Sequence, residues 1–191
     1  MITTYRVGYI VGSLSSVSIN RRLALALEKL APEAGLVLHE ISIAELPFYS
    51  QDYEAPDAEF PGAAAEYRDA VTKADGILIV TPEYNRSIPG VLKNALDWAS
   101  RPKGRAPLSG KPSYAVGASI GAIGTAVAQQ HLRSILSFLA SPELAQPEVY
   151  LHAKPGLIAE DGTITVEATR DFLLHALMAF RQHIAHTLHD H

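Results

Sequence analysis

Hydroxyl side chains are concentrated in a short segment near the start of the chain. The hydroxyl and amide residues of this segment are Ser13, Ser15, Ser16, Ser18 and Asn20. A helical pattern begins at Arg21, and the first amides of a helix lack intrahelical acceptors and carry a partial positive charge. A helix start with hydroxyl donors beside it binds anions, which makes this segment a candidate phosphate site. The alternative is that the serines only cap the helix and shape the turn.

The composition of this segment favours a phosphate monoester over a bridging pyrophosphate. A dinucleotide-binding turn requires G-x-G-x-x-G, but Gly12 is the only glycine here. A P-loop requires a lysine in G-x-x-x-x-G-K-[ST], and the segment contains none. Hydroxyl groups and helix amides can surround a terminal phosphate, so the pattern favours FMN over NAD or FAD as the bound nucleotide.

A second polar loop, which contains Pro82, follows the apolar run Ile77–Val80. Pro82 fixes its own φ and stiffens the turn, so we expect the amides of the next three residues to be free to face a ligand. These three residues are Glu83, Tyr84 and Asn85. Backbone amides can polarise the pyrimidine edge of a flavin without titrating, and Tyr84 can lie against a flat ring. The alternative is that Tyr84 packs in the core and Asn85 forms an Asx-turn.

A third loop contains the sequence G-x-S-x-G around Ser119 and supports a rival interpretation. This pattern is the nucleophile elbow of serine esterases, and acidic residues and histidines follow in the right chain order. These are Asp161, Asp171, His175 and His183. An elbow enters its helix at once, whereas the helical pattern here begins several residues after Ser119. An esterase would also leave the hydroxyl-rich segment without a role, so the glycines are better explained by close approach of backbone to a ligand.

Composition limits the remaining classes of function. The 191 residues are 48% hydrophobic and 19% charged, as in ordinary globular proteins. The net charge is -4 and Lys and Arg form no dense cluster, which argues against a nucleic-acid partner or a membrane-surface helix. The absence of cysteine excludes disulfides and thiolate chemistry and favours a cytoplasmic protein. Any redox activity must therefore use a bound cofactor.

Histidines crowd the C-terminus, at His183, His186, His189 and His191. No carboxylate completes a 2-His-1-carboxylate site with them, and chain ends fray. We therefore predict an exposed tail, with adventitious metal binding at most and no metal centre.

The elements that must position these loops alternate regularly along the chain. Strands are expected at residues 6–11, 36–41, 77–80, 113–118 and near 149–151, and helices at 21–30, 63–74, 91–100, 125–140 and 166–188. Residues 43–62 are expected to form an irregular segment, because they contain three prolines. Five alternations predict a three-layer, doubly wound parallel sheet in a single α/β domain over residues 1–191. Ligands of such sheets bind at the carboxyl ends of the strands, where all three loops fall.

Two longer motifs strengthen this interpretation. They are P-E-Y-N-x-S-x-P-G at residues 82–90 and L-K-N-A-x-D-W at residues 92–98. With Gly12-Ser13-Leu14, L-S-G-K-P at residues 108–112 and H-L-R at residues 131–133, they make the chain resemble the NADPH-dependent FMN reductase family. This family comprises flavodoxin-fold enzymes and includes bacterial quinone, chromate and azo-dye reductases. The resemblance runs from about residue 6 to residue 150.

The resemblance implies a flavodoxin-like five-stranded sheet in the order 2-1-3-4-5. It implies that FMN is held at its phosphate by Ser13, Ser15, Ser18, Ile19 and Asn20, and around its ring by Pro82, Glu83, Tyr84, Asn85, Ser119 and Gly121. It also implies a homodimer, or a homotetramer built from two dimers. Two residues depart from the family pattern. Ser15 stands where many members carry an arginine on the phosphate, and Val127 stands where related chromate reductases carry an arginine that joins dimers.

The expected reaction is ping-pong hydride transfer from NAD(P)H, through N5 of FMN, to a small-molecule electron acceptor. The acceptor is a quinone, a free flavin, an azo compound or a metal oxyanion. Because the cofactor carries the chemistry, no catalytic side chain is expected. The remaining alternative is a flavodoxin-like electron carrier, which needs a strongly acidic docking face, and a net charge of -4 is mild.

Overall fold

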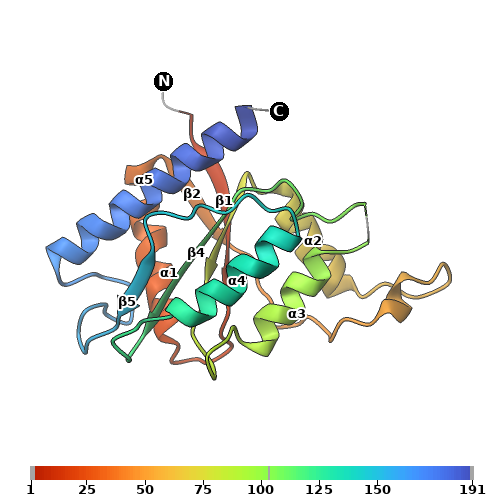
Figure 1. Ribbon diagram of the computed structural model, residues 1–191, viewed down its shortest axis with the longest axis horizontal. Coiled ribbons are helices and arrows are strands. Elements are labelled where there is room, and N and C mark those ends of the chain that lie inside the picture. The colour runs from red at the N-terminus through yellow and green to blue at the C-terminus, as the bar shows by residue number, and fades with distance from the viewer. Residues whose placement is uncertain (1–2, 103, 190–191) are drawn as a thin grey trace.

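Five parallel strands form a sheet in the order β2-β1-β3-β4-β5 in this computed structural model, which describes residues 3–102 and 104–189 (Figure 1). The strands are β1 Tyr5–Val11, β2 Leu36–Glu40, β3 Gly76–Val80, β4 Ser113–Ser119 and β5 Val149–His152. The helices are α1 Ile19–Leu30, α2 Gly62–Lys73, α3 Gly90–Ala99, α4 Ala126–Phe138 and α5 Glu167–His189. The doubly wound fold and the strand order are thus both confirmed.

Strand β3 lies at the centre of the sheet and is buried along its whole length. Its side chains alternate between the two faces, with Leu78 and Val80 in one core and Ile77 and Ile79 in the other. All four are fully buried, which confirms the prediction of a strand covered on both faces.

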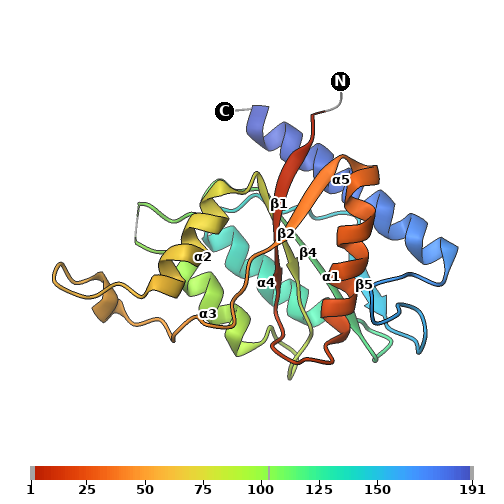
Figure 2. The same cartoon turned by 180° about the vertical axis from the view of Figure 1, so that it is seen from behind.

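Two helical layers provide that cover (Figure 2). Helices α1 and α5 pack on the face that carries Leu78, and α2, α3 and α4 pack on the face that carries Ile77. The apolar face expected for the first helix is confirmed, since Leu23, Leu27 and Leu30 are all buried. Helix α1 begins two residues earlier than predicted, because Ser18 caps it.

The segment between β2 and α2 loops out beside α3 and is irregular, as expected, apart from a 3-10 turn at Gln51–Glu54 (Figure 1). Trp98 of α3 anchors it by donating a hydrogen bond from Nε1 to the carbonyl of Pro47 at 2.8 Å. Tyr49, Tyr53 and Phe60 pack their rings around the indole. The segment is therefore held by aromatic contacts rather than by regular structure.

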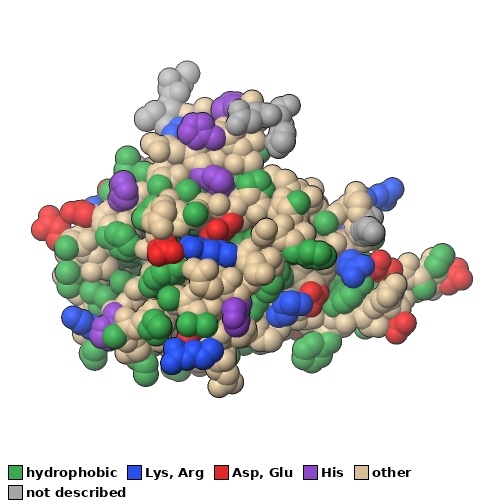
Figure 3. Space-filling model, in the orientation of Figure 1, with side chains coloured by type: hydrophobic (Ala, Val, Ile, Leu, Met, Phe, Trp, Pro, Cys, Tyr) green, Lys and Arg blue, Asp and Glu red, His purple; other side chains and the backbone are tan. Residues whose placement is uncertain are grey.

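Within residues 3–102 and 104–189, none of the helices combines the length and apolar character that a membrane span requires. On the face seen in Figure 3, Lys and Arg side chains are scattered among Asp and Glu rather than gathered into one patch.

Candidate functional site

The three loops singled out in the sequence lie side by side at the carboxyl edge of the sheet. Their strands are in register, with Val11 paired to Val80 and Val80 paired to Val116. Hydrogen bonds extend this pairing one residue into the loops. Gly12 donates to the carbonyl of Val80 and Thr81 donates to the carbonyl of Val116, both at 2.9 Å. The ends of β1, β3 and β4 therefore form one continuous edge.

The hydroxyl-rich loop delivers the N-terminus of α1 to this edge. Ser18 is the N-cap, and its Oγ accepts a hydrogen bond from the amide of Arg21 at 3.3 Å. The amides of Ile19 and Asn20 precede any intrahelical acceptor, so they are the ones left for an anion. Ser13 is buried and its Oγ accepts from the amide of Ser15, whose own side chain is exposed. Serine capping and anion binding are thus compatible at this helix start.

Asn20 uses its side chain to clamp α1 onto β4. Its Nδ2 donates to the carbonyl of Ala118 and its Oδ1 accepts from the amide of Ala118, both at 2.9 Å. The side chain is buried, and these two bonds continue the backbone pairing of β4 beyond the end of β3. What Asn20 offers a phosphate is therefore its backbone amide.

The loop after β3 closes into a tight hairpin at Tyr84–Ser87. The amide of Tyr84 donates to the carbonyl of Ser87 at 2.9 Å, and the reverse bond measures 3.0 Å. The two residues between them have positive φ, 51° at Asn85 and 67° at Arg86, as a primed hairpin turn requires. The expectation that three consecutive amides are free was therefore wrong for Tyr84. Those of Glu83 and Asn85 have no acceptor within the described part of the chain.

Tyr84 connects this hairpin to the hydroxyl-rich loop. Its phenol oxygen lies 3.4 Å from Oγ of Ser13, and the side chain is 50% exposed. Tyr84 is consequently not a core residue, and about half of its side-chain surface is accessible. The alternative in which Tyr84 packs in the core is excluded.

Glu83 fixes the hairpin to a neighbouring helix. Its Oε2 accepts hydrogen bonds from the amides of Val127 and Ala128, both at 3.1 Å. The side chain is only 9% exposed, and its other oxygen pairs with Arg86 at 3.3 Å. A carboxylate at a helix N-terminus satisfies orphan amides and complements the helix dipole. This carboxylate replaces the cap that Thr125 does not supply.

Ser119 and Gly121 form the third loop, where Oγ of Ser119 accepts from the amide of Gly121 at 3.1 Å. The next helix begins only at Ala126, so the loop is not a nucleophile elbow. His152 pairs with Ser119 across the strands, but His152 bonds to no carboxylate among the residues described. The nucleophile elbow on which the esterase alternative depended is therefore absent from the loop after β4.

His183, His186 and His189 lie on α5, which continues to His189, rather than on a frayed tail. His183 is half-buried and its Nε2 lies 2.9 Å from the carbonyl of Pro142, which accepts from the first residue of β4. That places His183 at the amino end of β4, roughly 20 Å along the strand from Ser119. His191 lies outside the described residues.

These loops fit a phosphorylated flavin. A Cβ on Gly12 would meet Leu92 at 3.1 Å and Pro82 at 3.4 Å, so glycine is what lets the hydroxyl-rich loop cross so close to the ring hairpin. Residues 12–20 carry no carboxylate that would repel a phosphate. The helix amides, the exposed phenol of Tyr84 and the amide of Glu83 thus lie at the same edge of the sheet.

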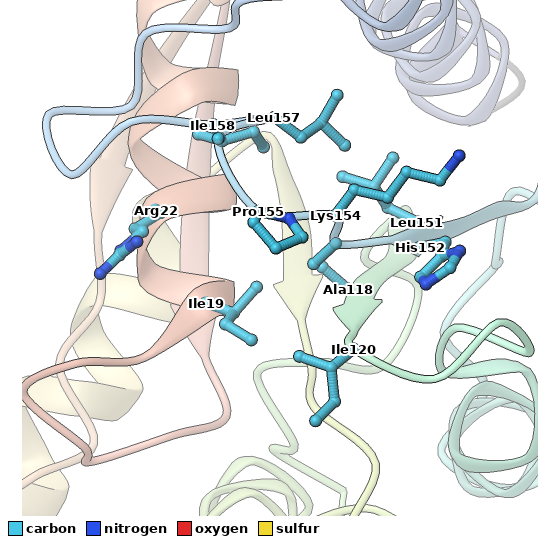
Figure 4. Close-up of a pocket in the computed structure, with 12 residues that line it drawn as sticks. Ile19, Arg22, Ala118, Ile120, Leu151, His152, Lys154, Pro155, Leu157 and Ile158 are labelled. Atoms are coloured by element: carbon cyan, nitrogen blue, oxygen red, sulfur yellow. The ribbon is translucent and has the colours of Figure 1, made fainter.

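A cavity of about 540 Å³ lies beside this cradle, between α1, the end of β4 and the segment after β5 (Figure 4). Of the residues predicted to contact the cofactor, it includes only Ile19. Its far wall, which runs from Leu151 to Ile158, was missed by the sequence analysis. The position of Lys154-Pro155-Gly156 in the sequence could have indicated this wall, because these residues follow a predicted strand and so lie at the carboxyl edge of the sheet.

The doubly wound fold and the loops at the carboxyl edge of its sheet define the class of flavodoxin-like nucleotide-binding proteins. Comparison with known proteins identifies the family within this class. The profile of the NADPH-dependent FMN reductase family matches residues 5–156. A 2-hydroxy-1,4-benzoquinone reductase of Burkholderia sp is 48% identical over 168 residues, which cover 88% of this chain and 90% of that protein. A quinone reductase of Pseudomonas putida is 43% identical over 173 residues, 91% of each protein.

Solved structures of related proteins support the same family assignment. The flavoenzyme FerB from Paracoccus denitrificans, an NAD(P)H:(acceptor) oxidoreductase, superposes with a TM-score of 0.89 at 38% identity, over 96% of this chain and 99% of that one. A flavodoxin from Pseudomonas aeruginosa shares the fold, with a TM-score of 0.56 at 19% identity over 93% of this chain and 99% of that one. The chain belongs to the NADPH-dependent FMN reductase family. It is accordingly a flavin enzyme, with FMN as cofactor and NAD(P)H as co-substrate.

Proposed function

We propose that this protein is an FMN-dependent reductase that uses NAD(P)H to reduce quinones and related acceptors by a ping-pong mechanism. The observation that carries the proposal is the approach of Tyr84 to Ser13, at 3.4 Å between their oxygens. It brings a helix N-terminus suited to a phosphate next to a hairpin suited to a flat ring. One cofactor that has both parts, FMN, would contact both loops.

At the phosphate end, the chain supplies helix amides and hydroxyls in place of cationic side chains. The amides of Ile19 and Asn20 would bind the phosphate oxygens, and Ser13, Ser15 and Ser18 would surround them. The clamp between Asn20 and Ala118 holds the helix start in position for this role.

At the ring end, the amides of Glu83 and Asn85 would donate to the polar edge of the flavin, with Pro82 stiffening the turn behind them. Ser119 and Gly121 would flank the ring from the loop after β4. The bonds of Glu83 to α4 keep these donors fixed, so that little reorganisation accompanies a change of charge on the ring.

Bound FMN would supply the redox chemistry, a two-electron hydride transfer from NAD(P)H and then to the acceptor, with the two substrates using the site in turn. The residues of the chain position the cofactor and exclude water from its bound face, and no side chain acts as obligate acid or base. The names of the two relatives support a quinone as acceptor. Free flavins, azo compounds and metal oxyanions remain part of the proposal.

We also propose that the enzyme is a cytoplasmic homodimer, with a homotetramer as the larger assembly. Large exposed apolar side chains support an interface, with Phe48 83% exposed and Phe138 88% exposed. Light scattering of the purified protein measures the mass directly. A monomer at micromolar concentration would contradict this part of the proposal.

The function itself is tested by anaerobic titration with NADPH. We expect the visible flavin absorbance of the FMN-loaded protein to bleach with one equivalent of NADPH and to return when a benzoquinone is added. In the steady state, double-reciprocal plots at several quinone concentrations should be parallel, because the two substrates use the site in turn. Flavin that is not reduced by NADPH or NADH would contradict the proposed function.

A further inference from the structure

The cavity beside the cofactor cradle has apolar walls. Ile19 of α1, Ala118 and Ile120 at the end of β4, and Leu151 and Pro155 from the far wall turn toward a common space (Figure 4). Ile120 is 77% exposed, which is unusual for so large an aliphatic side chain. Exposed apolar surface that surrounds a concavity favours a flat, apolar group in it.

The rim of the cavity is positively charged. Arg22 and Lys154 lie on opposite sides of the space with their head groups directed outward to the rim, and His152 belongs to the far wall (Figure 4). None of the described residues that line the cavity is a carboxylate. Arg22 pairs with Glu160 at 3.4 Å, but the Glu160 side chain is 90% exposed and this contact is weak in water. Lys154 makes no ion pair with any residue the structure describes.

The wall that carries Lys154 is well supported. The amide of Leu157 donates to the carbonyl of Lys154 at 3.1 Å, which closes a turn. Farther along, the Nζ of Lys29 on α1 donates to Asp161 at 2.9 Å and ties the same loop to the helix. Gly162 allows this docking, because a Cβ there would lie 2.7 Å from the backbone nitrogen of Ala26. These contacts hold the loop after β5 against α1, so they fix the shape of the cavity.

No residue of the ring hairpin, Tyr84–Ser87, lines the cavity. The cavity reaches the proposed ring site only through Ile120, which lies between Ser119 and Gly121, and its far wall lies beyond the residues proposed to hold the ring. A reacting group must touch the ring, so the far part of the cavity suits a group that does not react. The non-reacting half of a larger substrate has no such requirement. Binding energy from that half can be used to position the reacting half.

We propose that this cavity binds the adenosine-phosphate half of NAD(P)H, with the adenine against Ile19, Ile120 and Pro155 and the phosphates at the rim, beside Lys154. The proposal rests on the proposed function, because it assumes that NAD(P)H is the reductant of the bound flavin. The cavity volume of about 540 Å³ suits a nucleotide-sized group.

The test measures binding of adenosine 2′,5′-bisphosphate to the FMN-loaded protein by isothermal titration calorimetry. We expect Lys154→Ala to weaken binding about tenfold, as loss of one charge-assisted hydrogen bond does. Ile120→Glu, which places a carboxylate at an exposed position in the wall, should weaken it at least as much. Lys73→Ala, on the remote helix α2, is the matched control and should bind like the unsubstituted protein. The KM for NADPH should rise in parallel for the two cavity variants.

The experiment distinguishes failure of the cavity assignment from failure of the proposed function. If the unsubstituted holoprotein oxidises NADPH while all four proteins bind the bisphosphate equally, or none binds it, the cavity assignment is overturned and the proposed function stands. If the unsubstituted holoprotein does not oxidise NADPH or NADH, the proposed function itself fails, whatever the calorimetry gives.

Discussion

The carboxylate of Glu83, three residues past the end of β3, accepts a hydrogen bond of 3.1 Å from the backbone amide of Val127 at the start of α4. Forty-four positions separate the two residues in the sequence. The bond joins the loop proposed to hold the flavin ring to a helix that starts beyond the third loop, so one side chain fixes the spacing of two walls of the site.

Replacing Glu83 by glutamine preserves the shape of the side chain and removes its charge. We expect Glu83→Gln to lower the free energy of unfolding by about 1 kcal/mol, since a charged cap of the α4 N-terminus is lost. FMN should also bind more weakly, because the hairpin loses part of its anchor. Thermal melting and FMN titration measure the two effects. Glu66→Gln, on the exposed surface of α2, is the control; if both variants behave alike, Glu83 has no special role.

Asn20 offers a second test, because its side chain both donates to and accepts from the backbone of Ala118. Asn20→Asp removes the buried donor and places an oxygen against the carbonyl of Ala118. Leaving such groups unpaired costs about 1–3 kcal/mol. Urea unfolding should detect this loss, and Gln182→Glu on the exposed face of α5 should not cause it. Equal stability of the two variants would rule out the clamp.

The residue at position 15 should set how tightly FMN is held. The resemblance predicts an arginine there, and Ser15 is exposed beside the start of α1. We expect Ser15→Arg to tighten FMN binding about tenfold through one charge-assisted hydrogen bond to the phosphate. The gain should shrink in high salt, and the uncharged Ser15→Gln should not reproduce it. An unchanged dissociation constant for Ser15→Arg would mean that the phosphate lies elsewhere.

Acid should loosen the wall of the cavity. The Lys29 ammonium, together with two hydrogen bonds from Thr163, holds the pKa of Asp161 well below its usual range. A lowered carboxyl pKa contributes stability above the unfolded value of about 3.9, and this contribution is lost as the pH falls through the folded value. The melting temperature of the unsubstituted protein should therefore exceed that of Asp161→Asn at pH 6, and the difference should shrink as the pH falls below about 4. A difference as large at pH 2.5 as at pH 6 would contradict this account.

Sequence reasoning predicted the scaffold because its signals are local. The run Ile77–Val80 and the apolar face of α1 depend on neighbouring residues, and both lie where expected. The serine segment was placed at the correct edge for the same reason, since parallel strands bring all βα loops together.

What sequence reasoning missed depends on contacts between distant residues or on unusual backbone. Nothing local indicates that Glu83 caps α4. The hairpin that occupies the amide of Tyr84 needs positive φ at Arg86, a residue type for which this conformation costs roughly 1 kcal/mol. The cavity wall at Lys154 is recognisable only once α1 and the segment after β5 are seen together.

The central claim is that this edge holds FMN by its phosphate as well as by its ring. Equilibrium titration of the apoprotein with FMN and with riboflavin, followed by quenching of flavin fluorescence, tests it most directly. The account predicts one FMN per chain and binding of riboflavin weaker by about a hundredfold, because riboflavin has no phosphate for the amides of Ile19 and Asn20. Folded protein that takes up no FMN at large excess, or that binds riboflavin equally well, would contradict it.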